Sequence, residues 1–335
     1  MKNENIGQPK YGIIENLNKL EEYLINESKI SLIDIQKIST YLTNIREEAI
    51  NYTLCCKGDS EQLFDFLEWF DKYCTVDVKP NKDMIRHMVL NSLRGFNVKF
   101  KEEYGTMVLC SDAGNPWRRD FFPQYKHSRK MARLDGPFDW DNIFKIITEV
   151  KDEISKNFPY VVMYVENSEA DDIIATLCKQ QTEDLYLIIS GDKDFIQLHH
   201  YGNVYQWSPF LKSFIGEQED PIKFLREQII KGDRSDGVPN ILSPDDHFVR
   251  GGRQQPITKK KLEEWSNLDN IPLGSETKKH YNRNKKLIDL SQIPLTIEEN
   301  IINTFKNYKI PSRSLLLPYF IDNKMKSMIE NINDF

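Results

Sequence analysis

Two patterns of hydrophobic positions alternate along the first two thirds of the chain. One is the short, continuously apolar run that is typical of a buried strand, found at residues 30–34, 106–112, 160–165, 185–190 and 203–207. The other is an apolar residue at every third or fourth position, which predicts helices at residues 36–75, 84–98, 140–158 and 173–179. Such an alternation predicts an α/β fold class, with a parallel sheet covered by helices on both faces.

The pattern changes near residue 220. A helix is predicted at 221–230, no strand is predicted beyond it, and the remaining chain is helical and basic. The first 29 residues are polar with a helical pattern of apolar positions. We therefore expect three parts: a leader helix at 1–29, an α/β domain at 30–220 and a mainly helical domain at 221–335.

The composition excludes several classes of protein. Hydrophobic residues make up 39% and aromatic residues 11% of the 335 positions, which excludes a disordered chain. No apolar run approaches the roughly 18 residues that span a membrane, and no secretory signal follows Met1, so we expect a cytoplasmic protein. The five cysteines show no CxxC or Cys/His spacing, which predicts reduced thiols rather than a zinc site.

Acidic side chains follow the predicted strands. They are Asp34, Asp112, the group Glu169, Asp171 and Asp172, and the pair Asp192 and Asp194, with a further pair, Asp233 and Asp236, in the helical part. Because parallel strands end at the same edge of a sheet, we expect the first four groups to converge there. Clustered carboxylates repel one another unless cations compensate, and oxygen ligands suit Mg²⁺ and Mn²⁺. Two such ions about 3.5–4 Å apart form a centre for phosphodiester hydrolysis.

Each acid also has a structural alternative. A single Asp after a strand is commonly a helix cap or a turn residue, and acids in a first helical turn interact favourably with the helix dipole. Five such groups in one chain favour a shared site over five separate caps. The chain has no GxSxG elbow, no GxGxxG motif and no Walker A loop, which disfavours a nicotinamide enzyme and a P-loop ATPase.

The distribution of charge changes the meaning of the net charge. A net charge of −6 argues against a nucleic-acid binder. Positive charge is concentrated, however, in residues 118–133, with six Lys or Arg and one Asp, and in residues 247–290, with ten Lys or Arg and five acids. Both segments therefore predict contacts with phosphates.

Basic side chains interleave with aromatic rings between Trp117 and Lys130. This combination binds phosphates and stacks bases in proteins that hold single strands. If residues 125–130 are helical, Lys126 and Arg129 lie on one face, where they can grip a phosphate beside the metal ions. The alternative is a solvated basic loop.

These residues resemble those of a known family, the structure-specific 5′ nucleases or flap endonucleases, and in particular its phage ribonuclease H branch. The resemblance extends from about residue 30 to residue 335. It is carried by Leu32-Ile-Asp34, Val108-Leu-Cys-Ser-Asp112, Trp117-Arg-Arg-Asp-Phe121, Tyr125-Lys126, Glu169-Ala-Asp-Asp172, Gly191-Asp-Lys-Asp194, Gln206-Trp-Ser-Pro209, Lys231-Gly-Asp-Arg-Ser-Asp236 and Ile332-Asn-Asp-Phe335. It implies a PIN-like 5′-nuclease core and, at about residues 232–262, a helix–three-turn–helix element that holds duplex DNA.

The resemblance implies a 5′→3′ exonuclease and flap endonuclease that removes RNA primers and 5′ flaps during lagging-strand replication. It implies two Mg²⁺ ions, for which Mn²⁺ can substitute. Asp34, Asp112, Glu169, Asp171 and Asp172 would serve one metal region, and Asp192, Asp194, Asp233 and Asp236 the other. The implied roles in a helical arch at about 115–137 are phosphate binding for Lys126, Arg129 and Arg118, and stacking for Tyr125.

The implied substrates are RNA/DNA hybrids and flapped or nicked duplex DNA. The implied partners are a sliding clamp and a single-strand DNA-binding protein, and the nuclease itself is expected to be a monomer. The chain departs from the family pattern at Gly237, where the common motif has Asn, and at residues 238–246, which replace a glycine-rich hairpin. Residues 1–29 and much of 47–78 are additions that predict either partner-binding segments or extra packing helices.

Two rival functions follow from the same residues. A PIN-type ribonuclease that acts on single-stranded RNA shares the acidic sheet edge, but it does not usually carry a long basic helical domain. A non-catalytic DNA-binding protein of the replisome explains the basic segments, but it has no use for so many clustered acids. The preference for a junction-containing substrate over plain RNA separates the first rival from the nuclease, and the absence of cleavage identifies the second.

Overall fold

A computed structural model describes residues 81–335, except 128, 130–138, 181–182, 251–252 and 268–273. The chain divides into two compact units, Met1–Pro80 and Asn81–Phe335, and all described residues belong to the second. The leader helix, the strand predicted at 30–34 and the helices predicted at 36–75 lie outside the described residues. No helix in the described part is long and apolar enough to cross a membrane.

Four predicted strands are present, and they pair in parallel. β1 (Val108–Ser111) pairs with β2 (Val161–Tyr164), and β3 (Tyr186–Ile189) pairs with β4 (Val204–Ser208). The described strands form two sheets, β1–β2 and β3–β4–β5, rather than the single sheet that the pattern predicts. β5 (Ser213–Phe214) turns back antiparallel to β4. Its two residues are too few to form a hydrophobic pattern, so the sequence does not predict it.

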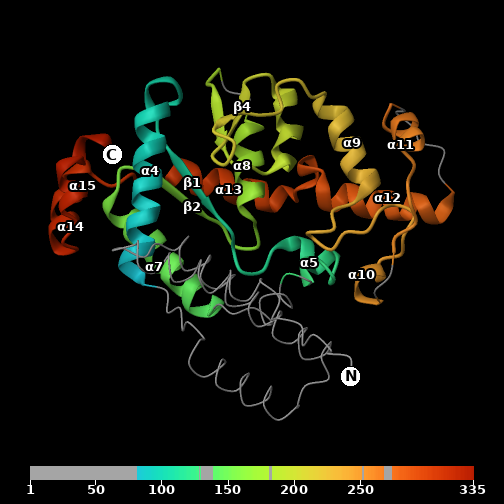
Figure 1. Cartoon of the computed structure of the whole chain (residues 1–335), viewed down its shortest axis with the longest axis horizontal. Coiled ribbons are helices and arrows are strands. Elements are labelled where there is room, and N and C mark those ends of the chain that lie inside the picture. The colour runs from blue at the N-terminus through green and yellow to red at the C-terminus, as the bar shows by residue number, and fades with distance from the viewer. Residues whose placement is uncertain (1–80, 128, 130–138, 181–182, 251–252, 268–273) are drawn as a thin grey trace, which may run out of the picture. The chain divides into compact units, whose positions relative to one another are not determined.

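Helices make up most of the remaining regular structure (Figure 1). The α-helices are α4 (Lys82–Tyr104), α5 (Trp117–Phe121), α7 (Trp140–Asn157), α8 (Ala170–Cys178), α9 (Pro221–Lys231), α10 (His247–Arg250), α11 (Lys259–Ser266), α12 (Ser275–Ile288), α13 (Leu295–Asn307), α14 (Leu316–Asp322) and α15 (Lys326–Glu330). The 3₁₀ helices are η1 (Lys193–Tyr201), η2 (Leu290–Gln292), η3 (Arg313–Leu315) and η4 (Ile332–Asp334). The helices predicted between residues 84 and 230 are therefore confirmed, apart from shifts at their ends.

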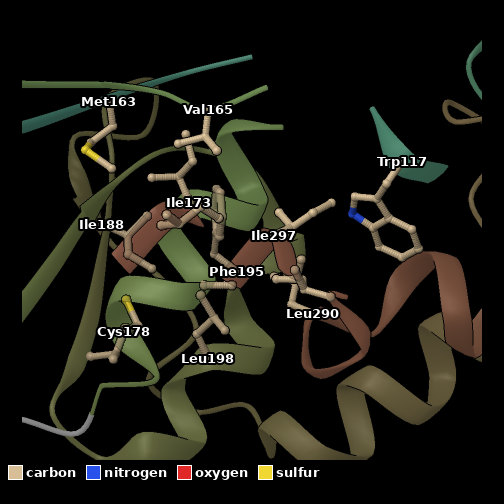
Figure 2. Packing of buried hydrophobic residues seen from close by; sticks show 14 of the residues in the cluster. Trp117, Met163, Val165, Ile173, Cys178, Ile188, Phe195, Leu198, Leu290 and Ile297 are labelled. Carbon is tan, nitrogen blue, oxygen red and sulfur yellow. The ribbon is translucent and has the colours of Figure 1, made fainter. Parts of the chain in front are cut away.

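Side chains of successive residues in β2 point to opposite faces, as in any strand. Val161, Met163 and Val165 join a hydrophobic cluster with α8, η1 and α13, which Figure 2 shows from close by. Tyr160 and Val162 join a second cluster with α4, α7, α14 and α15. Helices thus cover both faces of this strand, which explains why its sequence is continuously apolar.

The C-terminal helices return to the α/β core. Phe320 of α14, Met328 of α15 and the terminal Phe335 are buried in the cluster formed by α4 and α7. The rings of Phe158 and Phe335 pack edge to face with their centroids 5.6 Å apart. The strand-bearing and helical parts are therefore packed together within one compact unit of residues 81–335.

Candidate active site

The ends of the parallel strands bring separate acidic groups together. Asp112 follows β1, and its Oδ1 accepts the backbone N–H of Ala170 at 2.8 Å, which joins the end of β1 to the start of α8. Asp192 follows β3, and its Oδ1 caps η1 by accepting the N–H of Asp194 at 3.0 Å. Asp192 thus serves as a local cap, as the structural alternative predicts, whereas Asp112 binds the start of a helix that is distant in sequence. Both also follow the carboxyl end of a strand.

Asp171 and Asp172 are neighbours in the first turn of α8 but have different surroundings, since successive residues of a helix are rotated by about 100°. Asp171 lines a pocket. Asp172 is fully buried and accepts hydrogen bonds from the Glu169 N–H at 2.9 Å and from the Trp117 indole N–H at 3.2 Å. The Asp172 carboxylate is therefore occupied by protein groups and is not part of the pocket lining.

The turn after α9 holds the last pair of predicted acids, Asp233 and Asp236. It begins at Gly232, where φ is +69° and a Cβ would lie 2.4 Å from the Val238 carbonyl oxygen, so only glycine fits. Asp233 Oδ1 accepts the N–H of Ser235 at 2.7 Å, which closes the turn.

One pocket collects carboxylates from three elements that are distant in sequence. Asp171 comes from α8, Asp194 from η1, and Asp233 and Asp236 from the turn after α9. The other lining residues are Arg118, Tyr125, Val238, Leu287, Ile288 and Leu290. Of the remaining predicted ligands, Asp112, Glu169, Asp172 and Asp192 lie outside this lining and Asp34 lies outside the described residues.

The crowding of carboxylates changes their acidity. Burial and the neighbouring carboxylates of Glu169 and Asp192 raise the pKa of Asp171 to about 7. Burial and the carboxylates of Asp192 and Asp233 likewise raise the pKa of Asp194 to about 7. Both groups are therefore partly protonated near neutral pH, and a cation that binds beside them replaces those protons.

Glu169, the N-cap of α8, is held by two cations and a hydroxyl. Lys126 Nζ lies 2.6 Å from its Oε1, and Arg118 Nη1 lies 3.0 Å from its Oε2. The Tyr125 hydroxyl lies 3.0 Å from Oε2 and 2.8 Å from Asp236 Oδ2, so it donates to one of these two carboxylates. Burial alone would raise the pKa of Glu169, but Lys126 and Arg118 hold it below its usual range.

Arg118 and Tyr125 are more buried than the predicted contacts with nucleic acid require. Arg118 is 2% exposed, and its Nε donates to the Leu287 carbonyl oxygen at 2.9 Å while Nη1 binds Glu169 and Asp172. Tyr125 is 4% exposed, and its ring packs in a hydrophobic cluster formed with α9 and α12. The Arg118 guanidinium and the Tyr125 ring therefore contact protein groups rather than standing exposed on the surface.

Lys126 and Arg129 face the carboxylates from the same segment. Arg129 Nη2 pairs with Asp236 Oδ1, and its Nε donates to the Ser235 carbonyl oxygen at 3.0 Å. Lys126 Nζ lies 3.7 Å from Asp236 Oδ2. The predicted helical face does not form here, because Lys126 has a φ of +55° and the chain turns at this residue.

The pocket has the donor chemistry of a site for a divalent cation. In residues 81–335 with the exceptions given above, no three Asp, Glu, His or Cys side chains are spaced to hold an ion together. The pocket nevertheless brings together four carboxylates, the groups that hard divalent ions prefer as ligands, from Asp171, Asp194, Asp233 and Asp236. Burial and the neighbouring carboxylates raise the pKa values of Asp171 and Asp194, and a bound cation would favour the charged form of both groups. The residues present therefore fit such an ion.

Two polar contacts of the site were not predicted. Gln228 on α9 donates from Nε2 to Asp194 Oδ1 at 2.9 Å, and Trp117 donates to Asp172. Gln228 is one of several polar residues on an amphipathic helix, and no sequence signal separates it from the others. Trp117 belongs to the basic aromatic segment, whose composition indicates stacking but does not reveal a buried hydrogen bond.

Two family models match adjoining parts of the chain. Residues 76–228 match the N-terminal resolvase-like domain of 5′–3′ exonucleases, and residues 222–335 match the C-terminal domain of T4 RNase H. The two matches meet within α9, where the strand-bearing part gives way to the helical part.

Individual relatives give the same result. The ribonuclease H of Enterobacteria phage T4 is 36% identical over 270 residues, which cover 77% of this chain and 88% of that protein. The flap endonuclease Xni of Shewanella pealeana is 30% identical over 140 residues, or 37% of this chain and 50% of that protein. A solved structure of the phage T5 D15 flap endonuclease, a pseudo-enzyme-product complex with DNA and metal ions, is 16% identical. It covers 64% of this chain and 89% of its own, and its TM-score of 0.50 indicates a shared fold.

Proposed function

This chain belongs to the 5′ nuclease family of the phage T4 ribonuclease H, and we propose that it removes RNA primers and 5′ flaps by hydrolysing phosphodiester bonds. It is a 5′→3′ exonuclease and flap endonuclease by family. Its proposed substrates are RNA/DNA hybrids and flapped or nicked duplex DNA. The pocket in which Asp171, Asp194, Asp233 and Asp236 meet is the observation that supports this proposal most strongly.

The nuclease is metal-dependent, and the proposed ions are two Mg²⁺, with Mn²⁺ as a substitute. When bound, such ions polarise the phosphate and lower the pKa of a bound water molecule. The residues proposed to hold them are Asp34, Asp112, Glu169 and Asp171 in one region and Asp192, Asp194, Asp233 and Asp236 in the other. Asp172 was expected in the first region, but its bonds to Trp117, Arg118 and the Glu169 N–H support a positioning role instead.

Lys126 and Arg129 are proposed to bind the phosphate beside the bond that is cleaved. Their side chains are 16% and 42% exposed, and both end at carboxylates of the site. Divalent cations would engage the same carboxylates, Glu169 and Asp236, and would leave the two basic groups available for a phosphate. Two protein donors then orient carboxylates of the site: Arg118 donates to Glu169, and Gln228 donates to Asp194.

Duplex binding is proposed for residues 232–262, as the helix–three-turn–helix element. Side chains of α12 donate hydrogen bonds to the backbone of α9 and of the segment that joins α9 to α11. Arg283 Nη2 donates to the Pro239 carbonyl oxygen at 2.7 Å, and Asn284 Nδ2 donates to the carbonyl oxygens of Pro239 and Ile229, both at 2.8 Å. Exposed basic groups of this region are Arg250, whose side chain is 75% exposed and pairs with Asp246, and the three lysines that open α11. Such a surface binds the phosphate backbone without reading sequence.

The relatives also suggest where and with what the nuclease works. We propose that it acts as a monomer. We also propose that it acts in the cytoplasm of the host cell, because the relative that it matches over 88% of its length is a phage protein. A sliding clamp and a single-strand DNA-binding protein are the proposed partners, on the strength of the family resemblance. Co-sedimentation of the purified chain with each partner would test these contacts.

The two-ion proposal is tested with Asp171→Asn, which changes the pocket lining, and Asp192→Asn, which changes a proposed ligand outside that lining, each assayed for cleavage and for binding of a 5′-flap duplex. We expect cleavage to be lost and binding to be largely retained. Asp322→Asn is the matched control, because Asp322 is exposed at the end of α14. Near-normal turnover in both Asp171→Asn and Asp192→Asn would overturn the two-ion proposal.

A further inference from the structure

The turn that carries Asp233 and Asp236 contains a second glycine at which an added side chain would make a tight backbone contact. Gly237 has a φ of +74°, and a Cβ built on it would lie 3.0 Å from the Gln124 carbonyl oxygen. The Lys126 N–H donates to the Asp236 carbonyl oxygen at 2.8 Å. The backbone of residues 124–126 therefore rests directly on the backbone of this turn.

We call residues 122–127 and 129 the basic strap. Phe122 and Tyr125 anchor it, buried against apolar side chains of α9 and α12. Lys126 and Arg129 extend from it to the carboxylates of Glu169 and Asp236. The left-handed backbone of Lys126 is a conformation that a non-glycine residue keeps only where surrounding contacts hold it.

We propose that Gly237 is a positioning residue for Lys126 and Arg129. The missing side chain lets the basic strap dock on the turn that carries Asp233 and Asp236, and the docked strap sets both cations beside the carboxylate pocket. This inference rests on the proposed function and adds to it a residue that itself touches no substrate. It also accounts for the departure from the family pattern at position 237. An Asn accepts the left-handed backbone, but its Cβ would lie 3.0 Å from the Gln124 carbonyl oxygen, so the backbone of Gln124 would have to shift by a few tenths of an ångström.

Gly237→Asn and Gly202→Asn, compared in the full chain, separate docking from backbone strain. Both glycines have left-handed backbones, with φ of +74° and +80°, but a Cβ at Gly202 meets no heavy atom within 4 Å. We expect Gly237→Asn to lower the single-turnover rate of flap cleavage about tenfold or more, because a small displacement of a phosphate-binding group is costly to catalysis. Substrate affinity should change little, and Gly202→Asn should leave both quantities unchanged.

Limited trypsin digestion in EDTA reports on docking without any need for activity. Cleavage after Arg129 should be faster in Gly237→Asn than in wild type or Gly202→Asn. If the wild type cleaves no flapped substrate, the proposed function is wrong. The digestion still tests whether Gly237 lets the basic strap dock, because it does not depend on nuclease activity. Equal rates of digestion in the three proteins would overturn the inference.

A double-mutant cycle tests whether Gly237 acts through Lys126. In a Lys126→Ala background, Gly237→Asn should reduce the single-turnover rate by a smaller factor than in wild type, since one of the two groups that it positions has been removed. Losses of rate that multiply in full would contradict this coupling.

His127→Pro disturbs the strap from the other side and serves if Gly237→Asn fails to fold. A residue that precedes proline is held in extended conformations, so Lys126 would lose its left-handed φ while residues 233–237 stay unaltered. In a His127→Pro protein whose melting temperature matches wild type, we expect faster digestion after Arg129 and slower cleavage of the flap. Unchanged digestion and unchanged cleavage would overturn the inference.

Discussion

Replacing Arg118 by Met would leave two buried carboxylates without their shared cation. The Arg118 side chain is 3% exposed, and those of Glu169 and Asp172 are 4% and 0% exposed. Glu169 would keep its ion pair with Lys126, whereas Asp172 would lose the cation that pairs with it. Removing one partner of a buried ion pair costs about 3–5 kcal/mol, because the remaining charge, here that of Asp172, stays buried without compensation. We therefore expect Arg118→Met to lower the free energy of unfolding by about 4 kcal/mol, a large part of the roughly 5–15 kcal/mol of a typical domain.

The size of this loss should depend on pH. Arg118 contributes to the cations that hold the pKa of Glu169 below its usual range. Without it, the pKa of Glu169 rises, so the native variant binds protons that the native wild type does not bind. Stability falls with rising pH wherever the native state binds more protons than the unfolded state. The decrease in the free energy of unfolding caused by Arg118→Met should therefore be smaller at about pH 5 than at about pH 8.

Urea unfolding in EDTA at these two pH values measures this decrease. Arg94→Met is the matched control, because Arg94 Nη1 lies 3.3 Å from Asp334 Oδ2 with both side chains partly exposed, a pair worth about 0–1 kcal/mol. Arg118→Lys keeps the charge but not the planar fork, so its loss should be intermediate. A loss below about 1 kcal/mol for Arg118→Met, or the same loss at both pH values, would refute the reasoning.

Three further predictions concern the pocket and the basic residues. Because the pKa values of Asp171 and Asp194 are raised to about 7, the folded chain binds extra protons below that pH. Its melting temperature in EDTA should fall from about pH 5 to about pH 8, and Mg²⁺ should reverse the fall; a flat profile would contradict this. Lys126→Ala should slow the single-turnover rate of flap cleavage more than it weakens binding, and an unchanged rate would count against its phosphate contact. Replacing Lys259, Lys260 and Lys261 by Ala should weaken binding to unrelated DNA sequences equally and lower the salt slope by up to about 3, measured by fluorescence anisotropy; an unchanged slope would place the duplex elsewhere.

The sequence predicts the parts of the site that depend on the ends of strands. Asp112 and Asp192 follow apolar runs that become β1 and β3, and parallel pairing within each of the two sheets fixes the edge at which they emerge. The same logic correctly predicts helices on both faces of β2, because a strand buried on both faces has no polar positions. These features depend on local pattern and on the general geometry of parallel strands.

Other parts depend on contacts that no local pattern encodes. Arg118 and Arg129 come from one basic segment, yet Arg118 is buried between carboxylates, while the Arg129 side chain is 42% exposed and pairs with Asp236. The sequence shows the charge of each but not the depth at which α5 packs. Asp171 and Asp172 are the same residue type at neighbouring positions, so the sequence does not distinguish them. The orientation of α8 places Asp171 in the pocket and Asp172 against Trp117.

The most direct test of the central claim, a metal-dependent 5′ nuclease, is a cleavage assay with the purified wild-type chain. A 5′-flap duplex and a nicked RNA-primer/DNA duplex are incubated separately with Mg²⁺ and with EDTA, next to plain single-stranded RNA. We expect short 5′ products from both duplexes in Mg²⁺, none in EDTA, and slower cleavage of the plain RNA. Faster cleavage of the plain RNA would favour a PIN-type ribonuclease. Binding of the duplexes without cleavage in either Mg²⁺ or Mn²⁺ would contradict the account and leave a non-catalytic DNA-binding protein.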